Sequence, residues 1–255
     1  MSGKAMELIT SRDNPKIRRA IKLQSGKRQR EKEGLFCCEG EKLLKEALAC
    51  GVQVEQIFIS QNFPEERRRD WGPEAYLVTQ RLMEQMSGVE TPQGLLFVCR
   101  AQAPLQLPPP GECLILEDVR DPGNLGTAVR TAEAFDVPLV MTEGCAELYN
   151  PKTIRSTMGS VFRAKLCRAP AETIFDALDR RGTPLYAAAL SPQAQDVRQA
   201  QLKGAAVAVG NEARGVSPAL LRRSQGQVVI PIQGAESLNA GVAAALLMWE
   251  MRRSR

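Results

Sequence analysis

The most informative absence in this sequence of 255 residues is that of histidine, which does not occur once. Without an imidazole, the chain cannot build a Ser-His-Asp or Cys-His nucleophile, a histidine-ligated metal site or the usual general base of neutral pH. Acid-base chemistry must therefore rely on other groups. Hydrophobic residues at 44% and charged residues at 25% are otherwise typical of a globular chain with one large or two ordinary domains.

Two further features are missing, a CxxC cysteine pair and a long apolar run. The seven cysteines lack the spacing of a zinc ribbon or a thioredoxin-like redox site, and we expect them to be reduced and mostly buried. Their odd number favours a reducing compartment. Because there is also no cleavable apolar leader and no run of about 18 apolar residues, the sequence predicts a cytoplasmic protein without a membrane span.

Aromatic residues are few, at 5%, whereas basic residues are concentrated near the N-terminus. The whole chain has a net charge of +5, yet residues 12–32 hold nine basic side chains against two acidic ones, a local charge of +7. Such a cluster is expected of a protein that binds a phosphate backbone. A solvated helix face would carry the same charges, and the shortage of aromatics argues against base stacking as the main mode of binding.

The N-terminal part of the chain has an alternating pattern of helices and strands that ends at a proline-rich segment. The expected elements are helices near 14–32, 41–49 and 81–86 and strands at 54–59, 76–79 and 95–99. Residues 101–111 read AQAPLQLPPPG, with four prolines and no charge, which favours an extended linker. We therefore predict a first domain at 1–104, a linker at 105–111 and a second domain at 112–255.

The second domain alternates short, wholly apolar strands with helices. The expected strands are 113–116, 138–141, 185–190, 205–209 and 228–230, and the expected helices are 124–135, 151–158, 174–181, 218–224 and 238–253. This alternation predicts an α/β fold with a mostly parallel sheet covered on both faces. Since ligands bind such sheets at the carboxyl ends of the strands, functional residues are expected just after each strand.

Three constellations of residues lie at those positions. After the strand at 113–116 come Asn124, Gly126 and Arg130, with the spacing NxGxxxR. Taken singly, Asn124 could be a helix cap, Gly126 a site of close packing and Arg130 a surface cation. After the strand at 205–209 comes Gly210-Asn211-Glu212-Ala213-Arg214-Gly215, which could be a glycine-bounded connection or could hold a ribose or adenine edge. It is neither a Walker loop nor a GxGxxG fingerprint.

The third constellation follows the strand at 228–230 and contains Pro231, Ser237, Leu238 and Asn239. Ser237 or Asn239 can cap the helix that follows. That helix is rich in alanine and includes Gly241, so it permits close packing either within the chain or against a second copy.

Taken together, the three constellations resemble the three ordered motifs of the SpoU (TrmH) family of RNA ribose 2′-O-methyltransferases. Asn124-x-Gly126-x-x-x-Arg130, Gly210-x-Glu212-x-x-Gly215 and Pro231 with Ser237-Leu238-Asn239 occur in the family's order over about 140 residues. One departure is Gly241, where a serine is common. Residues 8–48, with Ser11-Arg12-Asn14-Pro15 and Glu39-Gly40, resemble more loosely the L30e-like substrate-binding domain of members that act on ribosomal RNA.

The resemblance implies a trefoil-knotted α/β methyltransferase domain that binds S-adenosylmethionine, forms a homodimer through the knotted region and requires no metal. By position, main-chain groups near Leu190, Gly210, Ile230 and Leu238 would hold the cofactor. Arg130 would act on the ribose 2′-hydroxyl, with Asn124, Glu212, Ser237 and Asn239 as the other catalytic-site residues. RNA contacts are expected from the basic residues Arg12, Lys16, Arg18, Arg19, Lys27, Arg28 and Arg30.

The sequence leaves open two alternatives to an enzyme that methylates large-subunit ribosomal RNA. One keeps the enzyme and makes transfer RNA the substrate, although the separate N-terminal domain favours ribosomal RNA. The other is a protein of the same fold that binds RNA or assists ribosome assembly without catalysis. The intact set of motif residues argues against this second alternative.

Overall fold

The computed structural model describes residues 6–68, 71, 74–234 and 236–253. The chain divides into two compact units. The first consists of Met1–Gln102 together with Tyr149–Arg155, and the second of Ala103–Leu148 and Ser156–Arg255. Among the described residues, no helix is both long and apolar enough to cross a membrane.

The first unit contains a five-stranded mixed sheet with the strand order β1-β4-β3-β5-β2. The strands β1, β4 and β3 run parallel to one another, whereas β5 is antiparallel to both β3 and β2. The strands are β1 (Glu7–Ile9), β2 (Leu35–Glu39), β3 (Val54–Ser60), β4 (Glu74–Val78) and β5 (Leu95–Arg100). The helices are α1 (Pro15–Ser25), α2 (Lys27–Glu33), α3 (Glu41–Ala49) and α4 (Gln80–Met86), with a 3-10 turn η1 at Glu65–Arg67.

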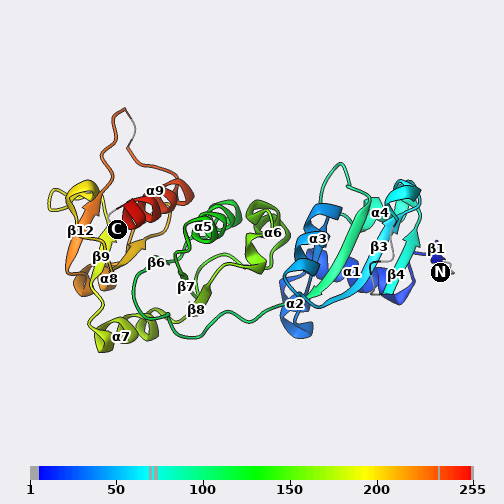
Figure 1. Cartoon of the computed structure of the whole chain (residues 1–255), viewed down its shortest axis with the longest axis horizontal. Helices are drawn as coiled ribbons and strands as arrows, with labels where there is room; N and C mark the ends of the chain where they lie inside the picture. The colour runs from blue at the N-terminus through cyan, green and yellow to red at the C-terminus, as the bar shows by residue number, and fades with distance from the viewer. Residues whose placement is uncertain (1–5, 69–70, 72–73, 235, 254–255) are drawn as a thin grey trace. The chain divides into compact units, whose positions relative to one another are not determined.

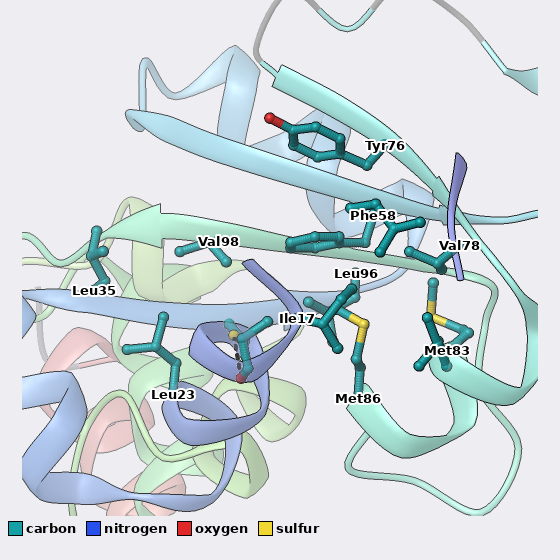
Figure 2. Packing of buried hydrophobic residues seen from close by; sticks show 14 residues of the cluster. Ile17, Leu23, Leu35, Phe58, Tyr76, Val78, Met83, Met86, Leu96 and Val98 are labelled. Atoms are coloured by element: carbon teal, nitrogen blue, oxygen red, sulfur yellow. Dashed lines mark hydrogen bonds between the residues drawn. The ribbon is translucent and has the colours of Figure 1, made fainter. Parts of the chain in front are cut away.

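The predicted basic helix at 14–32 is interrupted at Gly26, so that it forms two helices. Asn14 caps α1 by accepting a hydrogen bond from the Lys16 amide at 2.9 Å, and Pro15 occupies the first turn, where no amide donor is needed. Helix α1 buries Ile17, Ala20 and Leu23 against the sheet, in a core that includes Phe58, Met83, Met86 and Leu96 (Figure 2). The remaining face of α1 carries the basic side chains.

The second unit is built on a seven-stranded sheet with the order β10-β12-β9-β11-β6-β7-β8, in which every pair is parallel. The strands are β6 (Cys113–Leu116), β7 (Leu139–Thr142), β8 (Leu166–Ala169), β9 (Leu185–Ala188), β10 (Gln195–Asp196), β11 (Ala206–Val209) and β12 (Gly226–Val229). The helices are α5 (Pro122–Phe135), α7 (Ala171–Arg181), α8 (Pro218–Arg223) and α9 (Ala240–Arg253), with 3-10 turns η2 (Ser160–Phe162) and η3 (Val197–Gln199) (Figure 1). Helix α6 (Pro151–Thr157) belongs to the first unit up to Arg155 and to the second from Ser156.

The predicted parallel α/β architecture is confirmed. Strands β6, β7 and β11 are buried at every residue, because neighbouring strands and covering helices shield both faces of the sheet. Six of the seven cysteines are buried and Cys50 is partly buried, and none of the seven is in a disulfide, as the sequence predicts.

The proline-rich segment is attached to the second unit at two points. Leu105 donates its amide to the Leu166 carbonyl at 2.9 Å and accepts the Arg168 amide at 2.8 Å, forming a bridge beside β8. Further along, Arg181 donates to the Pro108 carbonyl at 2.5 Å. The segment therefore runs along the second unit at these residues.

Helices α5 and α9 approach each other closely, and this accounts for the glycine at position 241. A Cβ on Gly241 would lie 3.1 Å from Thr127 Cβ and 3.2 Å from both the Cα and the carbonyl oxygen of Asn124. A side chain there would need its neighbours to shift by a few tenths of an ångström. One use of the small-residue helix is thus packing within the chain.

Candidate active site at the carboxyl ends of the strands

The three predicted motifs follow strands of the same parallel sheet and emerge at one edge. Strand β6 ends at Leu116, before the segment with Asn124, and its neighbour β11 ends at Val209, before Gly210. Strand β12 ends at Val229, two places from β11. Parallel strands bring their carboxyl ends to the same edge, so the fold gathers segments separated by about a hundred residues.

Glu212 receives several hydrogen bonds from the segment after β6. Its carboxylate accepts from Asn124 Nδ2 at 2.9 Å and from the main-chain amides of Arg120 at 3.3 Å and Asp121 at 3.2 Å. Desolvation would raise the pKa of Glu212, but the hydrogen bonds from Asn124, Asp121 and Arg120 together hold it below the usual value. Glu212 is therefore a charged acceptor that fixes the turn before α5.

Asn124 and Asn239 extend this network to the third motif. Asn239 donates from Nδ2 to Asn124 Oδ1 at 2.7 Å. The Oδ1 of Asn239 accepts the amides of Gly241 at 2.9 Å and Val242 at 3.2 Å, so Asn239 caps α9, as the sequence predicts. A continuous path of hydrogen bonds thus runs from Glu212 through Asn124 to Asn239.

The possible role of Asn124 as a helix cap was wrong. The N-cap of α5 is Asp121, whose side chain accepts the Asn124 amide at 2.8 Å, and α5 begins at Pro122. Asn124 lies inside the first turn with 7% of its surface exposed. Its side-chain amide does not cap the helix and instead bonds to Glu212 and Asn239 of the other two motifs.

The loop after β11 requires its first glycine. A Cβ on Gly210 would lie 2.1 Å from the Gly215 carbonyl carbon, because Asn211 and Gly215 pair across the loop through two main-chain hydrogen bonds of 3.0 and 2.8 Å. Gly215 has a φ of +65°, in the left-handed region that favours glycine. The side chain of Asn211 also accepts the amides of Ala213 and Arg214. These contacts hold Glu212 in a closed, well-defined turn.

Arg130 is not part of this network. It lies on α5, six residues after Asn124, and is exposed. Among the residues that the structure describes, it forms no ion pair or hydrogen bond. Ser237 is likewise exposed and makes no hydrogen bond to the described part of the chain. Both side chains are therefore available to an incoming ligand.

The four predicted cofactor residues lie at the carboxyl ends of three adjacent strands. Leu190 follows β9, Gly210 follows β11, and Ile230 and Leu238 follow β12. Leu190 is 66% exposed, whereas Ile230 and Leu238 are partly buried. Apolar side chains at this edge can contact an adenine ring, and main-chain groups of the loops can bind the polar parts of a nucleoside.

A small cleft near Ile230 does not coincide with this set. Its volume is about 160 Å³, below the roughly 300 Å³ at which ligand pockets begin. Of the predicted cofactor residues only Ile230 lines it, with the other walls formed by Val197, Arg198, Pro231, Leu246 and Glu250. We therefore place the candidate cofactor site at the loop ends and not in this cleft.

The sequence reading missed Glu117, which joins the first motif to α8. Glu117 is 7% exposed, and its carboxylate accepts the amide of Ser217 at 2.7 Å and its hydroxyl at 2.6 Å. Ser217 in turn caps α8 by accepting the Leu220 amide at 3.1 Å. A carboxylate immediately after a wholly apolar strand was the signal that could have revealed it.

The expectation that Arg30 contacts RNA is corrected by its burial. Arg30 is 5% exposed and donates to the carbonyls of Leu23 at 2.6 Å and Gln24 at 3.2 Å, so its guanidinium holds α1 and α2 together. Arg19 is partly committed as well, in ion pairs with Glu33 at 2.5 Å and Glu55 at 3.5 Å.

The other predicted RNA-binding residues remain near the surface of the first unit. Arg12, Arg18, Lys27 and Arg28 are exposed, and Lys16 is partly buried with its ammonium 4.9 Å from the centre of the Tyr76 ring. Lys27 forms a loose pair with Glu31 at 3.6 Å between exposed side chains. Their charges are therefore accessible to an anionic partner.

Within the described residues, no group of three or more cysteine or carboxylate side chains is arranged to hold a metal ion.

Comparisons with known proteins place both units among RNA-modifying proteins. The model of the SpoU rRNA Methylase family matches residues 112–249, and that of the MRM3-like substrate binding domain matches residues 14–96. The 23S rRNA (guanosine(2553)-2′-O)-methyltransferase RlmP of Bacillus subtilis is 34% identical over 97% of this chain and 100% of its own length.

Two other comparisons extend this result. The 23S rRNA (uridine(2479)-2′-O)-methyltransferase of Streptomyces viridochromogenes is 32% identical, covering 52% of this chain and 50% of its own. The crystal structure of an AdoMet-bound rRNA methyltransferase from Sinorhizobium meliloti superposes with a TM-score of 0.86 at 27% identity, covering 97% of this chain and 98% of that chain.

Proposed function

Because the chain belongs to the SpoU rRNA Methylase family, we propose that it transfers a methyl group from S-adenosylmethionine to a ribose 2′-oxygen of 23S ribosomal RNA. It is an RNA 2′-O-ribose methyltransferase of α/β fold with an N-terminal substrate-binding domain. The observation that carries the proposal is the hydrogen-bonded path from Glu212 through Asn124 to Asn239, which joins all three motifs at one edge of the sheet.

Ribosomal RNA is favoured over transfer RNA because the similarity extends through both units. RlmP, which matches this chain over its entire length, is named for 23S rRNA. A purely RNA-binding role is disfavoured because the motif side chains are present and joined to one another.

The residues at the strand ends fit S-adenosylmethionine. Leu190, Ile230 and Leu238 would supply apolar surface for the adenine, and the closed turn from Gly210 to Gly215 would present main-chain groups to the ribose and methionine. When bound, the cofactor supplies an electrophilic methyl group on sulfur. Alignment of the 2′-oxygen with that methyl can lower the barrier by up to roughly 7–11 kcal/mol in well-oriented reactions.

Arg130 is the residue to which we assign the stabilisation of the reacting oxygen. A guanidinium keeps its proton in proteins, so a role as general base is physically unfavourable. A positive charge beside the 2′-oxygen instead stabilises the alkoxide that develops as the hydroxyl proton leaves to water or to an RNA phosphate. Asn124 and Glu212 hold the start of α5, and Ser237 and Asn239 contribute to the binding of the ribose and the C-terminal loop.

We further propose a homodimer formed through a knotted C-terminal region. Val242, Leu246 and Trp249 lie one or two turns apart on α9 and are 45%, 40% and 51% exposed. Such an apolar stripe on a helix is expected to be covered by a partner, and the family resemblance identifies that partner as a second copy. Light scattering tests this, with an expected mass of twice the 28.0 kDa of one chain.

The test of the function is a map of 2′-O-methyl groups in 23S rRNA from cells that lack the protein and from cells that express it. We expect one position to lose its methyl group in the deletion strain and to regain it on expression. The first positions to compare are those equivalent to the guanosine and the uridine named in the two relatives. Identical maps would contradict the proposal.

A further inference from the structure

Two residues after β6, the chain adopts a left-handed backbone conformation. Asp118 has a φ of +56°, in a region that residues other than glycine adopt uncommonly and that aspartate tolerates better than most. Its amide donates to Thr142 Oγ1 at 3.0 Å, and its carbonyl accepts from Asn211 Nδ2 at 2.9 Å. Such conformations persist where surrounding contacts enforce them, and they are concentrated at functional sites.

The carboxylate of Asp118 is also fixed. Thr142 Oγ1 donates to its Oδ1 at 2.9 Å, and a Cβ on Gly144 would lie only 2.1 Å from the same oxygen. Arg168 anchors the loop containing Gly144 by donating to the carbonyls of Glu143, Cys145 and Ala146 at 2.7 to 3.1 Å. The carboxylate therefore occupies a space that the loop leaves open by having glycine at position 144.

Arg214 is the cation that this carboxylate faces. Its Nη2 lies 3.8 Å from Asp118 Oδ2, and the two side chains are 66% and 38% exposed. An ion pair that is this long and exposed is weak, and at this distance the carboxylate does not occupy the donors of the guanidinium. Arg214 lies two residues after Glu212, in the turn that closes on the first motif.

The charged side chains at this edge of the sheet differ in how many contacts they make within the protein. The carboxylates of Glu212 and Asp121 accept main-chain amides within the site. By contrast, the side chains of Arg120, Arg130 and Arg214 are exposed. The edge therefore presents guanidinium groups outward, and the fork of donors on a guanidinium matches the oxygens of a phosphate.

We propose that Arg214 binds a phosphate of the RNA beside the target ribose and that Asp118 is the residue that positions its guanidinium. The proposal rests on the function proposed above, because it assumes that RNA reaches the edge of the sheet where the three motifs meet. Arg130 then acts at the reacting oxygen, while Arg214 fixes the backbone of the same nucleotide or its neighbour.

The test is the kinetics of methyl transfer by Arg214→Gln to unmodified 23S rRNA transcribed in vitro. Loss of one charge-assisted contact should raise the KM for RNA by about tenfold with kcat within about twofold. The salt dependence of RNA binding should become shallower by about 0.7 to 0.9 in log–log slope. The Kd for S-adenosylmethionine should not change. Arg214→Lys keeps the charge but loses the fork, so it should keep the wild-type slope with an intermediate KM.

Arg222 provides the matched control. It is exposed and lies in the last turn of α8, the helix that follows β11 and returns along the sheet, so it lies toward the amino ends of the strands. Arg222→Gln removes the same charge from the same unit and should leave both the KM and the salt slope unchanged. An equal effect of the two variants would show a general charge effect and would overturn the assignment of a specific contact.

The positioning role of Asp118 is tested by a double-mutant cycle. Asp118→Asn keeps an oxygen for Thr142 but removes the charge that orients Arg214, so it should raise the KM in the wild-type background. It should have little further effect in the Arg214→Gln background, because the group that it positions is already absent. Additive losses would overturn this role.

The outcomes separate this inference from the proposed function. Methyl transfer by the wild type with an unchanged KM and slope in Arg214→Gln would overturn the phosphate contact and leave the function intact. Weaker S-adenosylmethionine binding by Arg214→Gln would assign Arg214 to the cofactor and would also overturn the inference. No methyl transfer by the wild type to 23S rRNA would overturn the proposed function, and this inference with it.

Discussion

Glu212 accepts hydrogen bonds from residues that lie 88 to 92 positions earlier in the chain. The charged carboxylate of Glu212 accepts from neutral N–H groups of Arg120, Asp121 and Asn124. Such hydrogen bonds are stronger than those between two neutral partners. At the residue scale, Glu212 thus holds the turn before α5 and the side chain of Asn124 in place.

Substitution of Glu212 by glutamine should destabilise the protein. In the wild type both carboxylate oxygens of Glu212 accept hydrogen bonds. A glutamine keeps one accepting oxygen, but its NH2 group replaces the other and would face an N–H donor. We expect Glu212→Gln to lower the free energy of unfolding by about 1–2 kcal/mol at pH 7. Urea denaturation followed by circular dichroism measures this difference.

The pH dependence of that difference provides the control. The pKa of Glu212 is lowered in the folded state, so its contribution to stability is complete above the pKa of the unfolded chain, about 4.3 for glutamate. This contribution is lost as the pH falls through the folded pKa. The gap between Glu212→Gln and the wild type should therefore shrink in acid below about pH 4.3. A gap of constant size would contradict the assigned role of the charge.

Individual roles could be predicted from the sequence only where the spacing of residue types was distinctive. The spacing of Asn124, Glu212 and Asn239 indicated a shared site, and the structure joins them. Arg30 and Asp118 could not be interpreted in this way. The burial of Arg30 depends on how α2 packs against α1. The left-handed backbone of Asp118 depends on Thr142 at the end of β7 and on Gly144 just after that strand.

At the scale of elements, the strongest signals were runs of apolar residues long enough to cross a sheet. Strands such as β6 and β11 were predicted within one residue of their bounds. Strands β1, β2, β8 and β10 were missed. Strand β8 is interrupted by Arg168, and β10 has only two residues, both polar. Gly26 was also overlooked as the break between α1 and α2.

The second prediction concerns RNA binding by the basic surface of α1 and α2. Arg18 and Arg28 are exposed, so reversing both charges should weaken RNA binding. Each lost phosphate contact should reduce the slope of log affinity against log salt by about 0.7–0.9. Filter binding across a series of salt concentrations measures both quantities.

Arg30 serves as the contrasting variant for that experiment. Because it is buried and bonded to Leu23 and Gln24, Arg30→Ala should lower the melting temperature and leave the salt slope unaltered in the folded protein. An unchanged slope in the variant with Arg18 and Arg28 reversed would instead show that the cluster is only a solvated face.

At the scale of the whole molecule, the two units differ in their sheets and in the surfaces that they expose. The first carries a basic helical surface on a mixed sheet, and the second carries the parallel sheet at whose edge the motifs meet. Composition and periodicity predicted this two-part α/β arrangement. They give no signal for the proposed knot or dimer, because both would depend on contacts between segments whose local patterns are ordinary.

The lack of histidine is consistent with the chemistry of this second unit. Methyl transfer from a sulfonium needs alignment and a positive charge near the developing oxyanion, and neither requires an imidazole. Arg130, which is exposed on α5, can provide that charge.

The most direct test of this account is the transfer of tritiated methyl from S-adenosylmethionine to unmodified 23S rRNA by the wild type and by Arg130→Ala, with cofactor binding measured in parallel by calorimetry. The account predicts that the wild type labels the RNA, that Arg130→Ala loses at least about a hundredfold in rate, and that both bind S-adenosylmethionine with similar affinity. Turnover by Arg130→Ala near that of the wild type would contradict it.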